Sequence, residues 1–242
     1  MTEINFKSRI FNYTDLAVKL FRYNVKIIFA NRFIYFLIAA FLFFLLIAII
    51  NIFSDTNSTS ASVYYILLLP GLLLIFYPTS FGIQNDEDSR MLEIIFSIPN
   101  YRYKVWLVRM IMIYFLVAVI LIVLAILSSV SIISVPIIEM VYQLMYPIFF
   151  LGSLAFMFST LTRSGNGTAV VMIIIGIVFW ISSGILSESE WNIFLNPFKS
   201  PENVSENVWI SIITNNRLYL LAGIILANLY GLLNLQKREK FM

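Results

Sequence analysis

Charged side chains gather in one short segment between two long apolar runs, and they are Asp86, Glu87, Asp88, Arg90 and Glu93. Acids in the first turn of a helix complement the helix dipole. Pro99 ends such a helix, because the residue before a proline avoids the helical region. Residues 85–98 therefore predict a short amphipathic helix between two spans. Such a helix could dock into a groove of a soluble partner. The alternative is an ordinary loop helix that is exposed to solvent and binds no partner.

Catalytic chemistry finds little support in the residue types of this chain. There is no cysteine and no histidine, which removes the thiolate nucleophile, the commonest general base and the commonest metal ligands. The pairs Ser128-Ser129 and Ser182-Ser183 lie in apolar runs without a neighbouring Lys or Asp. Serines in such runs usually bond to the backbone or allow close helix packing. We expect no enzymatic activity and no cofactor or metal bound by this chain.

Prolines and aromatic residues mark two further candidate sites. Pro70-Gly71 falls inside an apolar run, where a proline removes a helix hydrogen bond and favours a kink that serves packing or gating. Residues 187–215 hold two apolar clusters, one around Trp191 and Phe194 and one around Trp209, each too short to cross a bilayer. Two short re-entrant helices fit this region. These residues are candidates for a cargo path or an outer gate.

The elements that must position these residues are membrane-spanning helices. Of the 242 residues, 60% are hydrophobic and 12% charged, whereas soluble domains average about half and a quarter. The apolar residues form long runs of the length that a bilayer requires. We predict one all-α transmembrane domain over residues 1–242. It has an interfacial helix at 5–31 and six spans, at 33–53, 63–83, 106–132, 141–161, 168–186 and 217–235.

The basic residues predict the orientation of these spans. They precede the first span, lie between spans two and three and follow the last span, and Arg163 lies between spans four and five. Of the 16 lysines and arginines, only Lys199 and Arg217 fall on the other side. Basic residues stay on the cytoplasmic side, so we expect both termini to be cytoplasmic, in a plasma or inner membrane. The net charge of +3 thus indicates contact with membrane lipid rather than with nucleic acid.

The ordered set of features resembles the permease subunit of type-2 exporters of the ATP-binding-cassette (ABC) family. The acids Glu87 and Asp88, then Glu93, Pro99 and the basic Arg109 match the loop of that family, although Ser89 stands where a glycine is usual. The interfacial first helix, the six spans and the re-entrant region also match. So do the Asn216-Arg217 step into the last span and the basic-acidic tail at 237–240. The resemblance covers nearly the whole chain, with individually loose motifs.

The resemblance implies a permease that moves a hydrophobic or amphipathic cargo. It makes residues 85–98 a coupling helix that enters a cleft of an ATPase subunit, with Asp86, Arg90 and Glu93 among its contact residues. The chain has no Gly-rich Walker loop, so ATP and magnesium would bind to the separate ATPase. A second permease chain, identical or similar, would complete the pair. Two alternatives stay open: a membrane scaffold without cargo, and an ion-coupled transporter, which usually carries charged residues within its spans.

Overall fold

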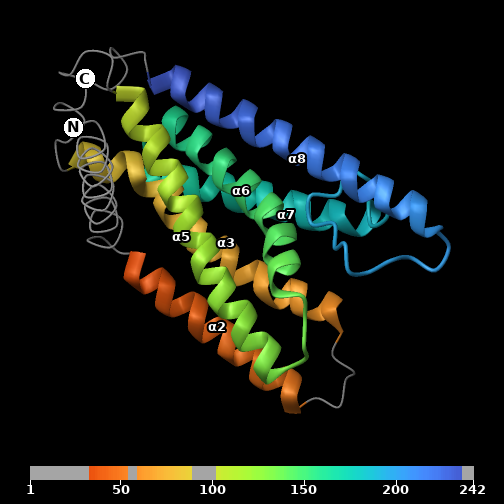
Figure 1. The fold of residues 1–242 in the computed structure, drawn as a ribbon. Coiled ribbons are helices and arrows are strands. Elements are labelled where there is room, and N and C mark those ends of the chain that lie inside the picture. The colour runs from red at the N-terminus through yellow and green to blue at the C-terminus, as the bar shows by residue number, and fades with distance from the viewer. Residues whose placement is uncertain (1–32, 54–58, 89–101, 236–242) are drawn as a thin grey trace, which may run out of the picture.

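A computed structural model describes residues 33–53, 59–88 and 102–235 of the chain (Figure 1). These residues form helices joined by turns, without a strand. The helices are α2 (Phe33–Phe53), α3 (Ser60–Asp88), α5 (Arg102–Ser131), α6 (Ile137–Thr162), α7 (Gly165–Ile185) and α8 (Glu206–Leu235). The expected interfacial helix at 5–31 lies outside the described residues, as do Arg90, Glu93 and Pro99.

All six helices are long and apolar enough to cross a membrane. The prediction of an all-helical, multi-pass membrane protein is therefore confirmed at this level. The longest helices are long enough to reach across the headgroup regions as well as the hydrocarbon core. The 29 residues of α3 rise about 44 Å, against about 40–45 Å for a whole bilayer.

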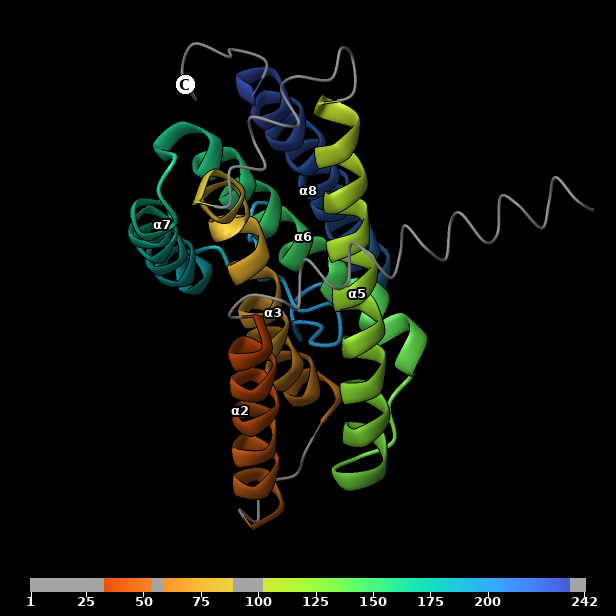
Figure 2. The ribbon, with the colours of Figure 1, turned by 90° about the vertical axis from the view of Figure 1, so that its left-hand side faces the viewer.

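Helices α3 and α6 form the centre of the bundle. Helix α3 contacts α2, α5, α6 and α7, and α6 contacts α5, α7 and α8 as well. Figure 2 shows α7 on one side of this pair and α5 on the other. The core accordingly lies along α3 and α6, whereas most apolar side chains of α7 are exposed. In a bilayer those exposed side chains contact lipid or another protein.

Two glycines allow α3 and α6 to approach closely. A Cβ added at Gly71 of α3 would lie 2.3 Å from Cδ1 of Ile148, and one added at Gly152 of α6 would lie 2.6 Å from Cδ1 of Ile75. Small residues at such contacts are typical of packed membrane helices. Pro70 and Pro78 lie inside the same continuous α3. The Pro70-Gly71 step thus lies buried in the central helix contact.

The helices alternate in direction, so the bundle has two distinct ends. We call them the Asp86 end and the Leu195 end. The α3 C-terminus and the turn between α6 and α7 lie at the Asp86 end, because the amide N–H of Gly165 donates to Oε1 of Gln84 at 2.6 Å. In that turn Arg163 adopts a left-handed conformation and Ser164 caps α7. The segment 186–205 lies at the Leu195 end, where Nδ2 of Asn196 donates to the carbonyl of Ala61 at 2.9 Å.

Two expectations about helix boundaries are wrong. Asp86, Glu87 and Asp88 form the last turn of α3 rather than the first turn of a separate helix. At the Leu195 end, residues 187–205 form turns and bends instead of a short helix, and the cluster around Trp209 belongs to α8. Helix α8 begins at Glu206, eleven residues before the start predicted from hydropathy. In both places a helix continues through polar residues because tertiary contacts satisfy their side chains.

A polar cluster joins three helices within the bundle. The hydroxyl of Tyr114 on α5 lies 2.5 Å from Oγ of Ser153 on α6, and Nδ2 of Asn228 on α8 donates to that Oγ at 2.8 Å. Hydrogen bonds of this kind fasten membrane helices to one another, since the alternative is a polar group in hydrocarbon. The cluster contains no charged residue, and its hydrogen bonds hold α5, α6 and α8 together.

Candidate functional site

The acid cluster predicted to dock a partner divides into one buried and two exposed side chains. Asp86 is only 4% exposed and Arg109, on α5, is 6% exposed. Their Oδ2 and Nη1 atoms lie 2.5 Å apart, and the guanidinium also lies over the ring of Trp106, 4.7 Å from its centre. The ion pair therefore fastens the end of α3 to α5, on either side of residues 89–101.

Glu87 and Asp88, by contrast, are exposed at the last turn of α3. A carboxylate at a helix C-terminus gains nothing from the helix dipole. Their charges are thus available to a partner, whereas the charge of Asp86 is used within the bundle. The structure brings Asp86 together with Arg109, and it leaves the two other acids facing outward.

At the Leu195 end, a repeated sequence shapes the segment between α7 and α8. In Asn192-Ile193-Phe194, Oδ1 of the asparagine accepts from the Phe194 amide at 3.0 Å. Asn196-Pro197-Phe198 repeats this turn, with Oδ1 accepting from the Phe198 amide at 3.0 Å. Asparagine stabilises turns by bonding to the backbone two residues on. The two turns replace the short helix that hydropathy predicted, and the spacing Asn-X-Phe is the signal that could have found them.

Arg217 and Asn216 hold this segment against the helices. Nε of Arg217 donates to Oε1 of Gln143 on α6 at 2.8 Å, and Nη2 donates to the carbonyl of Leu195 at 3.3 Å. Nδ2 of Asn216 donates to the carbonyls of Glu190 and Asn192, at 2.7 and 2.8 Å. The Tyr64 hydroxyl of α3 also donates to the Leu195 carbonyl, at 3.3 Å. The buried Arg217 guanidinium is thus bound by uncharged oxygens. Side chains of α3 and α8 bond to the segment between α7 and α8, and Arg217 links that segment to α6.

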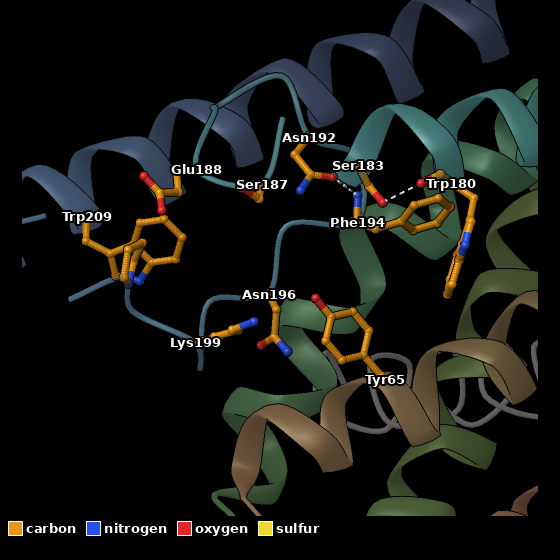
Figure 3. A pocket seen from close by; sticks show the side chains of 11 residues that line it. Tyr65, Trp180, Ser183, Ser187, Glu188, Asn192, Phe194, Asn196, Lys199 and Trp209 are labelled. Carbon is orange, nitrogen blue, oxygen red and sulfur yellow. Dashed lines mark hydrogen bonds between the residues drawn. The ribbon is translucent and has the colours of Figure 1, made fainter. Parts of the chain in front are cut away.

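A pocket of about 360 Å³ opens beside this network (Figure 3). Its walls come from α3, α7, α8 and the segment between α7 and α8, and its lining residues are Tyr65, Trp180, Ser183, Ser187, Glu188, Asn192, Phe194, Asn196, Lys199, Pro201 and Trp209. Figure 3 shows Glu188 beside Trp209 on one side and Lys199 beside Asn196 on another. Aromatic rings and a few polar groups in one concave site are typical of ligand pockets.

The predicted outer-gate residues separate into different environments. Phe194 and Trp209 are buried and line the pocket. Trp191 is 62% exposed and stacks on Tyr219, with ring centres 4.5 Å apart. Pro70 and Gly71 are buried in α3 and do not line the pocket. Sequence reasoning missed Tyr65, Asn192 and Asn196, which the turns and the fold of α3 bring together.

The residues that line this pocket are suited to binding a ligand. Among the residues that the structure describes, no group of three or more Asp or Glu side chains is placed to hold a metal ion. The pocket holds one acid and one base, and Figure 3 places Glu188 and Lys199 apart. Searches of protein-family models, of curated proteins and of solved structures gave no match to this chain.

Proposed function

We propose that this chain is the membrane-spanning subunit of an ATP-driven exporter, one half of a permease pair that a separate ATPase energises. The observation that carries the proposal is the path of α3. This helix runs from the exposed acids Glu87 and Asp88, through the centre of the bundle, to the pocket at the Leu195 end. One continuous helix thus connects the proposed docking surface with the pocket.

The ion pair of Asp86 and Arg109 supports a mechanical role for the Asp86 end. Residues 89–101 connect α3 to α5 along the chain, and the pair joins the last turn of α3 to Arg109 of α5. A partner that displaces residues 89–101 would therefore move α3 and α5 together. Rigid-body movements of packed helices are a common way to transmit such a displacement.

The α3 contacts at the Leu195 end would pass the movement to the pocket. Tyr64 donates to the Leu195 carbonyl, Ala61 accepts from Asn196, and Tyr65 lines the pocket. A shift of α3 along or across its axis therefore changes the position of the segment that closes the pocket. In the proposed cycle, ATP-driven closure of two ATPase subunits tilts α3 in both permease chains and exposes the cargo to the outer side.

The distribution of buried charge favours this proposal over ion-coupled transport. In the described part of the chain, the buried charged side chains are Asp86, Arg109 and Arg217. Each is bonded within the protein near one end of the bundle. Proton or sodium coupling generally needs titratable groups along the path inside the membrane.

Co-purification from native membranes tests the proposal against a scaffold without cargo. An affinity-tagged chain should retain a subunit that hydrolyses ATP and contains a Walker loop, identified by mass spectrometry and by its ATPase activity. The charge-reversal variant Glu87→Lys with Asp88→Lys should lose this subunit while inserting normally. Glu202→Lys, an exposed acid at the Leu195 end, is the matched control and should retain it. Equal recovery of the ATPase with both variants, or no ATPase with the unaltered chain, contradicts the proposal.

A further inference from the structure

The polar pocket at the Leu195 end shares two of its lining side chains with an apolar groove. The groove has a volume of about 420 Å³ and lies among α2, α3, α6 and α7. Trp180 and Phe194 line both cavities, and their ring centres lie 6.2 Å apart. Each cavity falls within the roughly 300–1,000 Å³ of small-molecule sites. A ligand placed beside these two rings would therefore contact the walls of both cavities.

The groove is apolar and the pocket is polar, like the hydrocarbon chain and the head of an amphiphile. The groove is lined by apolar side chains, and besides the two shared rings they are Phe36, Leu69, Leu72, Leu73, Ile75, Phe76, Leu151, Ala155, Met172 and Ile173, with Gly176. The pocket adds hydroxyl, amide and charged groups. Burial of a hydrocarbon chain in the groove and hydrogen bonding of a head in the pocket would satisfy both surfaces.

An unpaired amide in the pocket points to a polar ligand group. Asn192 is 6% exposed, and its Oδ1 is used by the Phe194 amide. Its Nδ2 donates to no atom in the described part of the chain, and Figure 3 shows this nitrogen directed away from the Phe194 bond, into the pocket. The nitrogen is accessible from the pocket rather than fully buried. An accepting oxygen on a ligand can therefore form a hydrogen bond with it.

The charges around the pocket indicate the net charge of the head. One acid, Glu188, and one base, Lys199, line it from separate parts of the segment. Among the side chains that line the pocket, these two charges cancel. The pocket therefore matches a head that is neutral overall. A zwitterionic head would place its positive group near Glu188 and its negative group near Lys199.

We propose that the chain binds a lipid-like amphiphile at this site, with a net-neutral, hydrogen-bond-accepting head in the pocket and a hydrocarbon chain in the groove. The Asn192 Nδ2 donates to the head, and Trp180 and Phe194 flank the junction of head and chain. The inference deepens the proposed function, on which it rests for the role of the pocket as a cargo site, although binding itself requires neither the ATPase nor a second permease chain.

Native mass spectrometry of the purified full chain in detergent tests the specificity of the site. The probes are phosphatidylethanolamine, which is zwitterionic, phosphatidylglycerol with the same acyl chains, which is anionic, and glycerophosphoethanolamine, which is the head alone. We expect one saturable phosphatidylethanolamine, bound about tenfold more tightly than phosphatidylglycerol, a difference of about 1.4 kcal/mol. The head alone should not bind at the same concentration. Equal binding of the two lipids, or uptake without saturation, identifies ordinary bilayer lipid and overturns the proposal.

Two glycines on α7 provide a matched pair of variants for the groove. Gly176 lines it and Gly184 does not, and an added Cβ meets no atom within 4 Å at either position. Gly176→Leu should therefore fill the groove without disturbing the fold and weaken phosphatidylethanolamine binding by about tenfold or more. Gly184→Leu should bind as the unaltered chain does. Equal binding by the two variants overturns the assignment of the groove.

The substitution Asn192→Asp tests the head. Aspartate keeps the oxygen that accepts from the Phe194 amide, removes the two N–H donors and adds a negative charge, which repels the phosphate oxygens of the head. We expect phosphatidylethanolamine binding to weaken by at least about two- to tenfold, the contribution of one hydrogen bond. Unchanged binding would remove Asn192 from the site and overturn the placement of the head. Because these measurements use the chain alone, their outcome is separate from that of ATPase co-purification.

Discussion

At the scale of single residues, buried charges at opposite ends of the bundle are stabilised in different ways. Arg109 pairs with the carboxylate of Asp86, whereas Arg217 donates to oxygens of Gln143, Asn216 and Leu195 and lies over the ring of Tyr146. A charged pair loses much of its solvation on burial, and removal of one partner is therefore more costly than removal of both. The two arginines accordingly predict different mutational behaviour.

Arg109→Leu should destabilise the protein strongly, by up to about 3–5 kcal/mol, because the buried Asp86 carboxylate loses this counter-ion. The double variant Asp86→Leu with Arg109→Leu should recover much of that loss, since neither charge remains. Thermal unfolding of the purified protein in detergent, for both single variants and the double variant, measures the coupling. Strictly additive effects would show that the pair contributes no interaction energy.

Arg217→Lys keeps the positive charge but cannot reproduce the fork of donors to Gln143, Asn216 and Leu195. We expect the segment 186–205 to lose its anchor and to be cleaved faster in limited proteolysis, with a loss of about 1–3 kcal/mol. Lys199→Arg, at an exposed side chain of the same segment, is the control and should be cleaved at the original rate. Equal cleavage of Arg217→Lys and the unaltered protein would contradict this anchoring role.

At the scale of helices, the close contact of α3 and α6 decides how the bundle packs. Gly152 faces Ile75, with no room for a Cβ between them. The same helices carry the pocket and groove residues Tyr65, Ile75 and Leu151. Spacing between α3 and α6 is therefore linked to the shape of the binding cavities, and a change in it should alter both stability and binding.

Gly152→Ala should destabilise the protein by about 1–3 kcal/mol, the usual cost of overpacking a core. Adding Ile75→Ala removes the atoms that the new Cβ meets, so the double variant should be more stable than the sum of the single effects. Gly184→Ala, where the added Cβ meets nothing, should instead be neutral or stabilising by up to about 1 kcal/mol. Thermal unfolding ranks the variants, and a Gly152→Ala protein as stable as Gly184→Ala would contradict the close contact.

At the scale of the whole molecule, the alternating helices and the asymmetry of basic residues predict an orientation in the membrane. Arg109 and Arg163 belong to the Asp86 end, and Lys199 and Arg217 to the Leu195 end. Together with the basic residues outside the described ranges, this distribution predicts that the Asp86 end is cytoplasmic. The proposed transport cycle depends on that orientation, because ATP is available on the cytoplasmic side.

The absence of cysteine from the sequence makes single-cysteine labelling a direct measurement of orientation. Ser200→Cys, exposed near the Leu195 end, should react with a membrane-impermeant maleimide added to intact cells. Asn166→Cys, exposed in the first turn of α7, should react only after the membrane is opened. The reverse pattern would invert the orientation and exclude an ATPase docked at Glu87 and Asp88.

The sequence alone determined the number and approximate position of the spans, because a bilayer requires long apolar runs whatever the tertiary contacts are. It also located the apolar clusters around Phe194 and Trp209 and the acids of the α3 end. Hydropathy missed the helix ends, since Gln84 and Asp86 in α3 and Asn216 and Arg217 in α8 interrupt the apolar pattern.

Only the tertiary structure decided those helix ends and the sites beside them. Gln84 accepts from Gly165, Asp86 pairs with Arg109, and Asn216 and Arg217 bond to the segment before α8. A polar group that finds its partner on another element no longer has to leave the helix or reach water. Such partners are distant along the chain, so periodicity cannot reveal them. The same long-range contacts bring Tyr65, Trp180 and Asn192 from separate elements into one pocket.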